Sequence, residues 1–364
     1  MIMSWDEVNQ LIRKMSKQIK IVDRSMSSGI AIFGAGPHGE MALRYLRDAG
    51  FKVLYFVDNN PAKHGTKIGG ITVVSPEQLK SLAPDIVFIA ARHAVVPISK
   101  QLTNLGQQSI SFDAYFVMKN LNRIKKVRDN LLNDDRSKLV YDSVLKAMLT
   151  GIKSYCAEVM EGQQYFALPT FQNADRVHFV DAGAYVGDTV EKFIWANNGV
   201  FSHIYAFEPG IFQFHALKKR VNRLIEEWAL QGTDITLIQA GLGSKDQELP
   251  IAVNRDQLQS SSFLSFNEAE KTSVPVFSLD RYLNGRPATF IKADIEGMEM
   301  DMLFGAKKTI EEFRPCLALS IYHRPEDIYQ IAEYVHSIVP EYRMAVRQHA
   351  SNLMETTLYC WVET

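Results

Sequence analysis

Short apolar runs alternate along the chain with longer segments in which apolar residues recur at helical spacing. The first series, "GIAIFGAGPHGEMALRYLRDAGFKVLYFVDNN", has the order strand, glycine loop, helix, strand, and its second strand ends at Asp58. The alternation continues through "GITVV" and "DIVFIAA" to a helix near Pro97–Leu105 and a short strand "SISFD". This pattern predicts a Rossmann-like α/β domain at residues 29–116, preceded by an amphipathic helix at residues 1–28.

The pattern then changes, and a second alternating series follows. Charged residues separate apolar ones at helical spacing over residues 117–170, which predicts a helical connector. In residues 171–364, "ELPIAV" and "SVPVFSL" predict a small β insertion, and "YRMAVRQ" and "TTLYCWVE" predict a closing antiparallel pair. The fold class is therefore α/β, with two doubly wound domains and one reversed strand in the second sheet. The strands expected in that sheet are Val177–Asp181, Ile204–Phe207, Ile235–Gln239, Thr289–Ala293 and Cys316–Tyr322.

Composition narrows the classes of function. The formal net charge is −1, so the chain lacks the basic excess that a nucleic-acid-binding surface needs. No apolar run is long enough to span a bilayer, and we therefore expect a cytoplasmic protein with a small-molecule partner. The three cysteines form no CxxC pair, which argues against structural zinc or a disulfide framework. Assembly into a homo-oligomer is left open.

The first glycine loop fits G-x-G-x-x-G between a strand and a helix. Backbone amides there can hold a diphosphate, and an acidic residue closing the next strand can accept ribose hydroxyls. The predicted nucleotide-binding set is Gly34, Gly36, His38, Gly39 and Asp58. No hydride-transfer residues accompany the loop, and "VDNNPAKHGTKIGGITVVSPEQL" resembles the nucleotide-sugar-binding domain of bacterial sugar N-acyltransferases. The alternative is a domain that packs and binds nothing.

The second glycine loop, "VDAGAYVGDT", has a different spacing, and the next strand ends in "FEP". Acidic residues that end two consecutive strands, together with a glycine turn, indicate an S-adenosylmethionine pocket. Asp188 and Thr189 are expected to cap the following helix. The predicted cofactor-binding residues are Asp181, Gly183, Ala184, Gly187, Asp188, Thr189, Glu208, Pro209 and Asp294.

Candidate catalytic residues follow the fourth and fifth strands of this series. His323 is the leading base, because an imidazole titrates near neutral pH; the alternative is a hydrogen bond to a loop carbonyl. Asp294 is the second candidate for the base; the alternative is a carboxylate that only orients the substrate or balances the charge of the sulfonium. Asp294, Glu296 and His323 also suit a divalent cation, Mg²⁺ or Mn²⁺, although their spacing does not prove one. Glu299 is expected as a solvated or capping carboxylate, and Ser260–Ser262 as a loop over the site or plain surface.

Five segments in order, "FVDAGAYVGDT", "YAFEP", "VFSLDRYL", "IKADIEGMEMDML" and "SIYHRPEDI", resemble the FkbM-type methyltransferases. "QYF" and the closing "ETTLYCW" resemble longer bacterial members of that family. The resemblance covers roughly Leu131 to the C-terminus and implies a class I S-adenosylmethionine-dependent fold that methylates hydroxyls of sugars or other metabolites. We therefore predict an O-methyltransferase acting on a sugar, a sugar nucleotide or a polysaccharide. The alternatives are an NAD(P)-dependent sugar-nucleotide oxidoreductase and a non-catalytic nucleotide-sugar-binding protein.

Overall fold

The computed structural model describes residues 4–24, 29–172, 177–252 and 271–363, so the predicted serine loop at 260–262 lies outside the described residues. The chain divides into two compact units. One comprises residues 1–128, 138–160 and 350–354, and the other residues 129–137, 161–349 and 355–364. The segment predicted as a connector, 117–170, thus contributes to both units.

The first unit is built on a sheet with the strand order β3-β4-β2-β1-β5-β6. The central strand β1 pairs in parallel with β2 and with β5, as the predicted strand–helix–strand order requires. Its strands are β1 (Ile30–Phe33), β2 (Val53–Val57), β3 (Lys67–Ile68), β4 (Ile71–Val74), β5 (Ile86–Ile89) and β6 (Ser109–Ser111). Among the described residues before β6, its long helices are α1 (Ser4–Arg24), α2 (Pro37–Asp48) and α4 (Val95–Asn104), with a short α3 (Leu79–Leu82).

Three helices follow β6. They are α5 (Phe112–Asn130), α6 (Asp135–Thr150) and α7 (Ser154–Ala157). The expected domain boundary at Phe116 falls inside α5, which continues without a break. No helix among the described residues is long and apolar enough to cross a bilayer.

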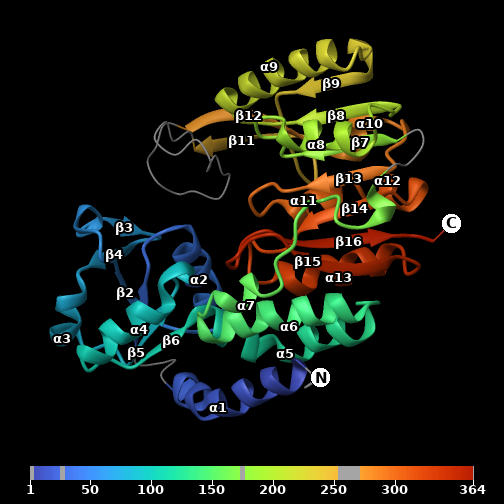
Figure 1. The fold of residues 1–364 in the computed structure, drawn as a ribbon. Coiled ribbons are helices and arrows are strands. Elements are labelled where there is room, and N and C mark those ends of the chain that lie inside the picture. Colours follow the sequence, from blue (N-terminus) through green and yellow to red (C-terminus); the bar gives the residue numbers. More distant parts are fainter. Residues whose placement is uncertain (1–3, 25–28, 173–176, 253–270, 364) are drawn as a thin grey trace. The chain divides into compact units, whose positions relative to one another are not determined.

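The second unit contains a seven-stranded sheet with the order β15-β16-β14-β13-β7-β8-β9 (Figure 1). The five strands from β14 to β9 are mutually parallel, and β16 runs antiparallel to β14, which confirms the predicted reversed strand. The strands are β7 (His178–Ala182), β8 (His203–Phe207), β9 (Ile235–Ile238), β13 (Phe290–Ala293), β14 (Cys316–Ser320), β15 (Arg343–Gln348) and β16 (Thr356–Trp361). The helices are α8 (Asp188–Ala196), α9 (Ile211–Glu227), α10 (Leu279–Leu283), α11 (Glu299–Gly305), α12 (Lys307–Phe313) and α13 (Asp327–Ile338).

The predicted β insertion lies between β9 and β13. β11 (Gln247–Ala252) pairs antiparallel with β12 (Lys271–Phe277), which also pairs in parallel with the short β10 (Gly241–Leu242). The insertion therefore leaves the alternation of the main sheet intact.

Aromatic packing fixes helix α8 on the sheet. Phe193 on α8 is fully buried and stacks on Phe179 of β7, with ring centroids 4.3 Å apart. Phe290 of β13 packs against both rings. Burial of these rings stabilises the unit by roughly 2 kcal/mol each. Because this face of α8 is committed to the core, the opposite face points outward.

Candidate functional site

The second glycine loop crosses the carboxyl edge of the seven-stranded sheet. The amides of Gly183 and Ala184 donate to the carbonyl of Phe207, at 3.0 and 2.9 Å. Gly183 has φ 75°, and a Cβ there would lie 2.0 Å from the carbonyl oxygen of Asp294. Only glycine therefore lets this loop lie against the end of β13.

The loop ends at Gly187, which is the N-cap of α8 with φ 82°. The helix has no side-chain cap, so the expectation that Asp188 and Thr189 cap it is wrong. Asp188 instead occupies the first helical position, and its carboxylate lies 3.9 Å from the ammonium of Lys192. Thr189 is buried. The left-handed glycine makes the tight turn that a capping side chain would otherwise hold.

Glu208 follows β8 and points into the same edge. Its carboxylate is buried and accepts hydrogen bonds from the amides of Tyr185 and Gly210, at 2.9 and 2.7 Å. Burial raises the pKa of Glu208 to about 7, against the opposing effect of these two amides. The structure thus holds a carboxylate in place within a poorly solvated site.

Asp181 lies near the end of β7, directly before the glycine loop. β7 and β13 pair in a register that sets Asp181 beside Lys292, and the carboxylate and ammonium are 3.0 Å apart. Both side chains are buried. Lys292 also donates to the carbonyls of Ala182 and Gly183, at 3.2 and 2.7 Å. Asp181 therefore supports the glycine loop through Lys292.

A cleft joins the glycine loop to the ends of β8 and β13. Its lining includes the predicted Gly183, Glu208, Pro209 and Asp294 together with Glu296. Ala184 is fully buried behind the loop. The structure thus brings four predicted cofactor residues to one cleft, and one of them, Asp294, is also a predicted catalytic residue, whereas His323 is not part of the lining.

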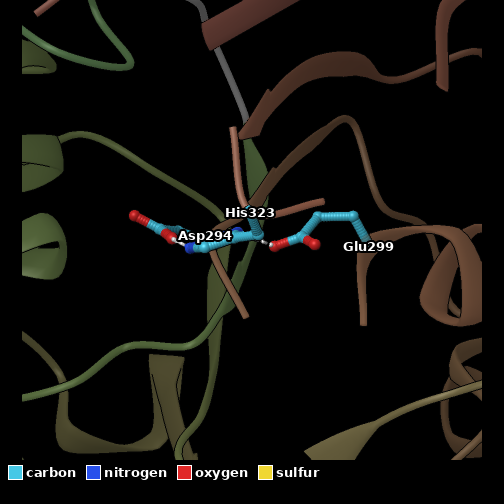
Figure 2. A group of neighbouring side chains, drawn as sticks. All are labelled: Asp294, Glu299 and His323. Atoms are coloured by element: carbon cyan, nitrogen blue, oxygen red, sulfur yellow. Dashed lines mark hydrogen bonds and ion pairs between the residues drawn. The ribbon is translucent and has the colours of Figure 1, made fainter. Parts of the chain in front are cut away.

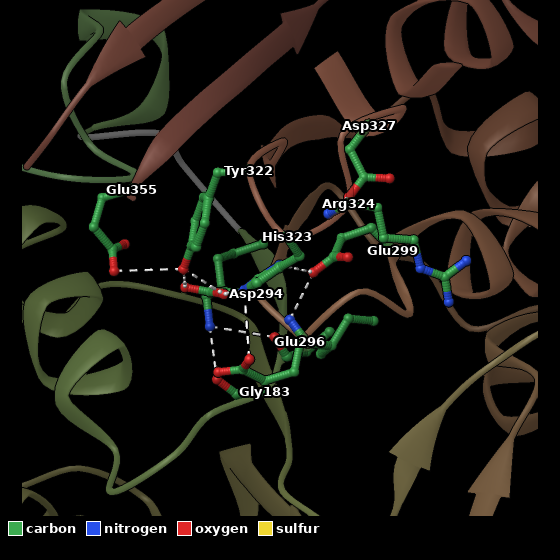
Figure 3. A network of polar contacts seen from close by, with 12 residues as sticks. Gly183, Asp294, Glu296, Glu299, Tyr322, His323, Arg324, Asp327 and Glu355 are labelled. Carbon is green, nitrogen blue, oxygen red and sulfur yellow. Dashed lines mark hydrogen bonds and ion pairs between the residues drawn. The ribbon is translucent and has the colours of Figure 1, made fainter. Parts of the chain in front are cut away.

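Asp294 is the centre of a polar network at this cleft (Figure 3). The hydroxyl of Tyr165 donates to Oδ2 at 2.6 Å, and the hydroxyl of Tyr322 donates to Oδ1 at 3.2 Å. Burial favours the neutral carboxyl, but His323 and Lys292 outweigh it and hold the pKa of Asp294 below its usual value. Asp294 is therefore an anion with its orientation fixed by several donors.

His323 lies between carboxylates on both sides of its ring. Its Nδ1 is 2.9 Å from Oε1 of Glu299, and its Nε2 is 3.3 Å from Oδ1 of Asp294 (Figure 2). Burial disfavours the charged ring, but Glu299 and Asp294 outweigh burial and raise the pKa of His323 to about 10. The ring is therefore an imidazolium at neutral pH.

Glu299 differs from the expectation of a solvated carboxylate. It is fully buried, and besides His323 it accepts a hydrogen bond from the amide of Ile295 at 2.9 Å. The helical position alone suggested solvent, but α11 begins inside the cleft wall. The role of Glu299 is to hold His323.

Glu296 is the carboxylate of this group that reaches solvent. Its side chain is 48% exposed, and its Oε2 lies 3.8 Å from Nε2 of His323. Partial burial of its own carboxylate raises the pKa of Glu296 to about 7, although His323 opposes this. It thus combines access to the cleft with a pKa near neutrality.

Left-handed backbone at non-glycine residues also gathers here. Such conformations cost on the order of 1–3 kcal/mol each and are retained where the surrounding structure enforces them, often at functional sites. The residues concerned near the cleft are Gln163 (φ 56°), Tyr165 (φ 70°), Tyr185 (φ 48°), Glu296 (φ 55°) and Glu355 (φ 60°). Three of these belong to the network around Asp294, since Glu355 lies 3.4 Å from the hydroxyl of Tyr322.

The predicted metal group can be compared with this geometry. The group of described residues whose ligand atoms lie within 4.8 Å of one another is Asp294, Glu299 and His323. Nε2 of His323 is buried and has no hydrogen-bond partner there, as an atom facing a ligand would be. A cation at Nε2 would compete with the proton that the raised pKa retains, so the donor set suits a cation only after deprotonation.

In the first unit, the predicted acidic residue is already engaged by its own loop. Asp58 accepts from the amides of Ala35 and Asn60, at 2.9 and 2.8 Å, and lies 3.2 Å from the ammonium of Lys63. Burial opposes this, but these partners hold the pKa of Asp58 below its usual value. A Cβ at Gly39 would lie 1.9 Å from the carbonyl oxygen of Gly34. The first loop is therefore closely packed.

A second cluster lies beside that loop. Nε2 of His38 is 3.0 Å from Oδ1 of Asp113, and the guanidinium of Arg92 lies 2.8 Å from Oδ2 of the same carboxylate. Asp113 is buried, and Arg92 and His38 together hold its pKa well below its usual value against the effect of burial. The structure thus places the guanidinium of Arg92 and the ring of His38 on one buried carboxylate near the predicted glycine loop.

Sequence reasoning missed part of the second site. Lys292, Tyr165 and Glu355 were assigned no function, although Tyr165 lies in the "QYF" segment and Glu355 begins "ETTLYCW". The resemblance of these two segments to the FkbM-type family was the signal that could have identified Tyr165 and Glu355. Lys292 contacts Asp181 and the carbonyls of Ala182 and Gly183 because β13 pairs with β7. The sequence around Lys292 does not show this pairing.

The strand order with its reversed β16, the glycine loop after β7 and the acidic residue after β8 define a class I S-adenosylmethionine-dependent methyltransferase fold. The family model of the methyltransferase FkbM domain matches residues 181–346, which lie in the second unit. A second family model, C2185-like, N-terminal, matches residues 26–111.

Solved structures include similar proteins. The methyltransferase FkbM from Methylobacillus flagellatus KT superposes with a TM-score of 0.62 at 21% identity, covering 98% of this chain and 99% of that chain. UDP-D-quinovosamine 4-dehydrogenase from Vibrio fischeri gives 0.21 at 26% identity, over 23% of this chain and 75% of that one. Aeropyrum pernix fibrillarin, in complex with S-adenosyl-L-methionine, gives 0.33 at 10% identity, over 54% and 69%. No curated protein matches the chain.

Proposed function

We propose that this protein transfers a methyl group from S-adenosylmethionine to a hydroxyl of a sugar, carried by a nucleotide or within a polysaccharide. The observation that carries this proposal is the cleft itself. It joins Gly183 and Glu208, which suit the cofactor, to Asp294 and Glu296, which suit an acceptor hydroxyl. A donor site and a proton acceptor thus share one cavity, as in-line transfer requires.

The cofactor half of the cleft is assigned as follows. Glu208 accepts hydrogen bonds from the ribose hydroxyls, since each of its oxygens has a second lone pair beyond those used by Tyr185 and Gly210. Gly183 and Gly187 shape the loop that the cofactor lies against. Asp181 acts through Lys292 by fixing that loop. Ala184, Asp188, Thr189 and Pro209 complete the surroundings of the loop and of Glu208.

S-adenosylmethionine held by these residues would supply an electrophilic methyl group to the acceptor oxygen, with its own thioether as the leaving group. Glu296 takes the proton of the hydroxyl, because it is the half-exposed carboxylate of the cleft and its pKa lies near 7. Asp294 orients the hydroxyl as a hydrogen-bond acceptor. His323, which the sequence suggested as the base, is held as an imidazolium and positions Asp294.

A second proposal for the same side chains is that they bind a divalent cation, Mg²⁺ or Mn²⁺. It would bind at Nε2 of His323 with Asp294 and Glu296, while Glu299 orients the ring through Nδ1. When bound, it would lower the pKa of an acceptor hydroxyl. The test is activity after exhaustive EDTA treatment: unchanged turnover excludes an exchangeable cation, and loss that Mg²⁺ or Mn²⁺ restores supports one.

For the first unit we propose binding of a sugar nucleotide. Gly34, Gly36 and Gly39 form a loop at the start of α2, and the ammonium of Lys63 lies 2.8 Å from the carbonyl of Ala35 in that loop. The ammonium of Lys63 supplies positive charge for a diphosphate, and His38 occupies the second position of α2. Asp58 already has three partners, which leaves it less free for a ribose than in a dinucleotide site.

Calorimetry separates these proposals from the alternatives. The purified protein is titrated with S-adenosylmethionine, with NAD and with a panel of UDP- and GDP-sugars. We expect micromolar binding of S-adenosylmethionine, which the Glu208→Ala variant loses, and binding of at least one sugar nucleotide, which Lys63→Ala weakens. Tight NAD binding without any response to S-adenosylmethionine would instead support an oxidoreductase.

A further inference from the structure

A groove of about 710 Å³ runs along the outer face of α8 in the second unit. Asp188, Glu191, Lys192 and Trp195 line it, and their spacing places them on one face of the helix. The opposite face of α8 is fixed in the core through Phe193. The lining face is therefore held rigidly toward solvent.

Trp195 is the unusual member of this lining. It is 64% exposed, although an indole is among the most costly side chains to leave in water. Its ring meets that of Trp228 edge to face, with centroids 4.9 Å apart. The neighbouring ring limits the rotamers of Trp195, so the groove contains a fixed, flat apolar surface.

The remaining lining is polar, and its charges balance. The ammonium of Lys192 lies 3.9 Å from Asp188, and the guanidinium of Arg220 on α9 lies 3.3 Å from Glu191. Two acids and two bases give the groove no net formal charge. A polyanion or a polycation would therefore find no complementary field there, and a lipid chain would meet too many polar groups.

Two chain segments reach both the groove and the cleft, although the two linings have no residue in common. Gln163 and Phe166 line the groove, while the two residues between them contact the network around Asp294. Gln164 hydrogen-bonds to Glu355, and Tyr165 hydrogen-bonds to Asp294. On the other side, Asp188 of the groove directly follows the glycine loop of the cleft. The segment at 163–166 and the glycine loop thus connect the groove covalently to the cleft.

We propose that this groove is a subsite for a neutral saccharide chain, which holds the units next to the sugar that is methylated. A pyranose has an apolar C–H face that stacks on an indole and a rim of hydroxyls that bonds to amides, carboxylates and guanidinium groups. The inference rests on the proposed function, because it assumes a sugar acceptor. It adds that the acceptor is a chain of several units.

The test measures binding of neutral pentasaccharides, namely cellopentaose, maltopentaose and chitopentaose, by calorimetry without S-adenosylmethionine. Trp195→Ala is compared with Phe304→Ala, which removes another exposed ring of the same unit, 49% exposed and packed edge to face on Tyr334. We expect at least one pentasaccharide to bind, and Trp195→Ala to weaken it about tenfold or more. As controls, Phe304→Ala should bind the pentasaccharide as tightly as the wild type does. The corresponding monosaccharides should not bind.

Absence of binding for all three pentasaccharides, or equal effects of the two variants, would overturn the saccharide subsite. A shift in sedimentation caused by Trp195→Ala alone would also overturn it, since the groove would then join copies of the chain. The proposed function is judged separately by titration of S-adenosylmethionine into the same proteins. Loss of that binding with saccharide binding intact would count against the methyltransferase assignment and not against the groove.

Discussion

The hydroxyl of Tyr165 donates a 2.6 Å hydrogen bond to Oδ2 of Asp294, although 129 positions separate the two residues. Asp294 directly follows β13 of the seven-stranded sheet, whereas Tyr165 lies in the segment that precedes β7. The bond fixes the carboxylate that we assign to orientation of the acceptor. It therefore links a segment outside the sheet to the reaction centre.

Tyr165→Phe removes this bond and leaves the packing of the ring in place. Hydrogen bonds to charged groups contribute about 1.5–3 kcal/mol, so we expect turnover to fall about tenfold or more with unchanged affinity for S-adenosylmethionine. Steady-state kinetics and calorimetry measure the two quantities. Tyr334→Phe, which alters a tyrosine away from Asp294, is the control and should turn over normally. Unchanged kcat in Tyr165→Phe would remove this bond from the account.

Glu208 predicts a pH dependence of cofactor binding. Ribose hydroxyls donate best to the ionised carboxylate, and the pKa of Glu208 is raised to about 7. Affinity for S-adenosylmethionine should therefore rise as pH increases through 7 and be about tenfold lower at pH 6 than at pH 8. Calorimetry at constant ionic strength measures this, and Glu208→Gln should bind weakly with a flat profile. A wild-type profile that is flat from pH 6 to pH 8 would contradict the assignment.

Glu296 and Glu299 provide a matched pair for the base assignment. With Glu296 as base, kcat/KM should rise through about pH 7, because only the ionised carboxylate accepts a proton. Glu296→Gln should lower turnover about 10²–10⁴-fold and abolish that limb. Glu299→Gln weakens the support of His323 but keeps the limb. If Glu296→Gln retained both rate and pH profile, the proton would have to go elsewhere.

The buried pair of Asp181 and Lys292 predicts an asymmetric effect on stability. Lys292→Met leaves the carboxyl of Asp181 without its partner in the core, which typically costs about 3–5 kcal/mol of the free energy of unfolding. The double variant Asp181→Leu, Lys292→Met removes both charges and should recover much of that loss. Chemical denaturation measures the three proteins. Equal stability of Lys292→Met and wild type would show that the pair is dispensable for the fold.

The fold of the second unit could be predicted because its signals are local. Each glycine or acidic residue that marks a strand end stands directly after an apolar run, as at Gly183 and Glu208. The reversed strand could be predicted because two apolar segments lie close together near the C-terminus. Parallel strands end at one edge, so these residues were expected to meet there, and they line one cleft.

The remaining features depend on contacts that no local pattern contains. Lys292 faces Asp181 only through the register of β13 on β7. Tyr165 comes from a segment without strand or helix periodicity, so its role could not be read from spacing. The imidazolium state of His323 follows from carboxylates that arrive from the β13 and α11 side, and an isolated histidine would have the ordinary pKa.

The most direct test of the central claim is methyl transfer itself. The protein is incubated with S-adenosylmethionine labelled with ¹³C in the methyl group and with the sugar nucleotides and neutral oligosaccharides named above. We predict a labelled O-methyl product, detected by mass spectrometry and by the chemical shift of its methyl carbon, and its loss in Glu296→Gln. Transfer of the label only to nitrogen or carbon acceptors, or none in a protein that binds both ligands, would contradict the account.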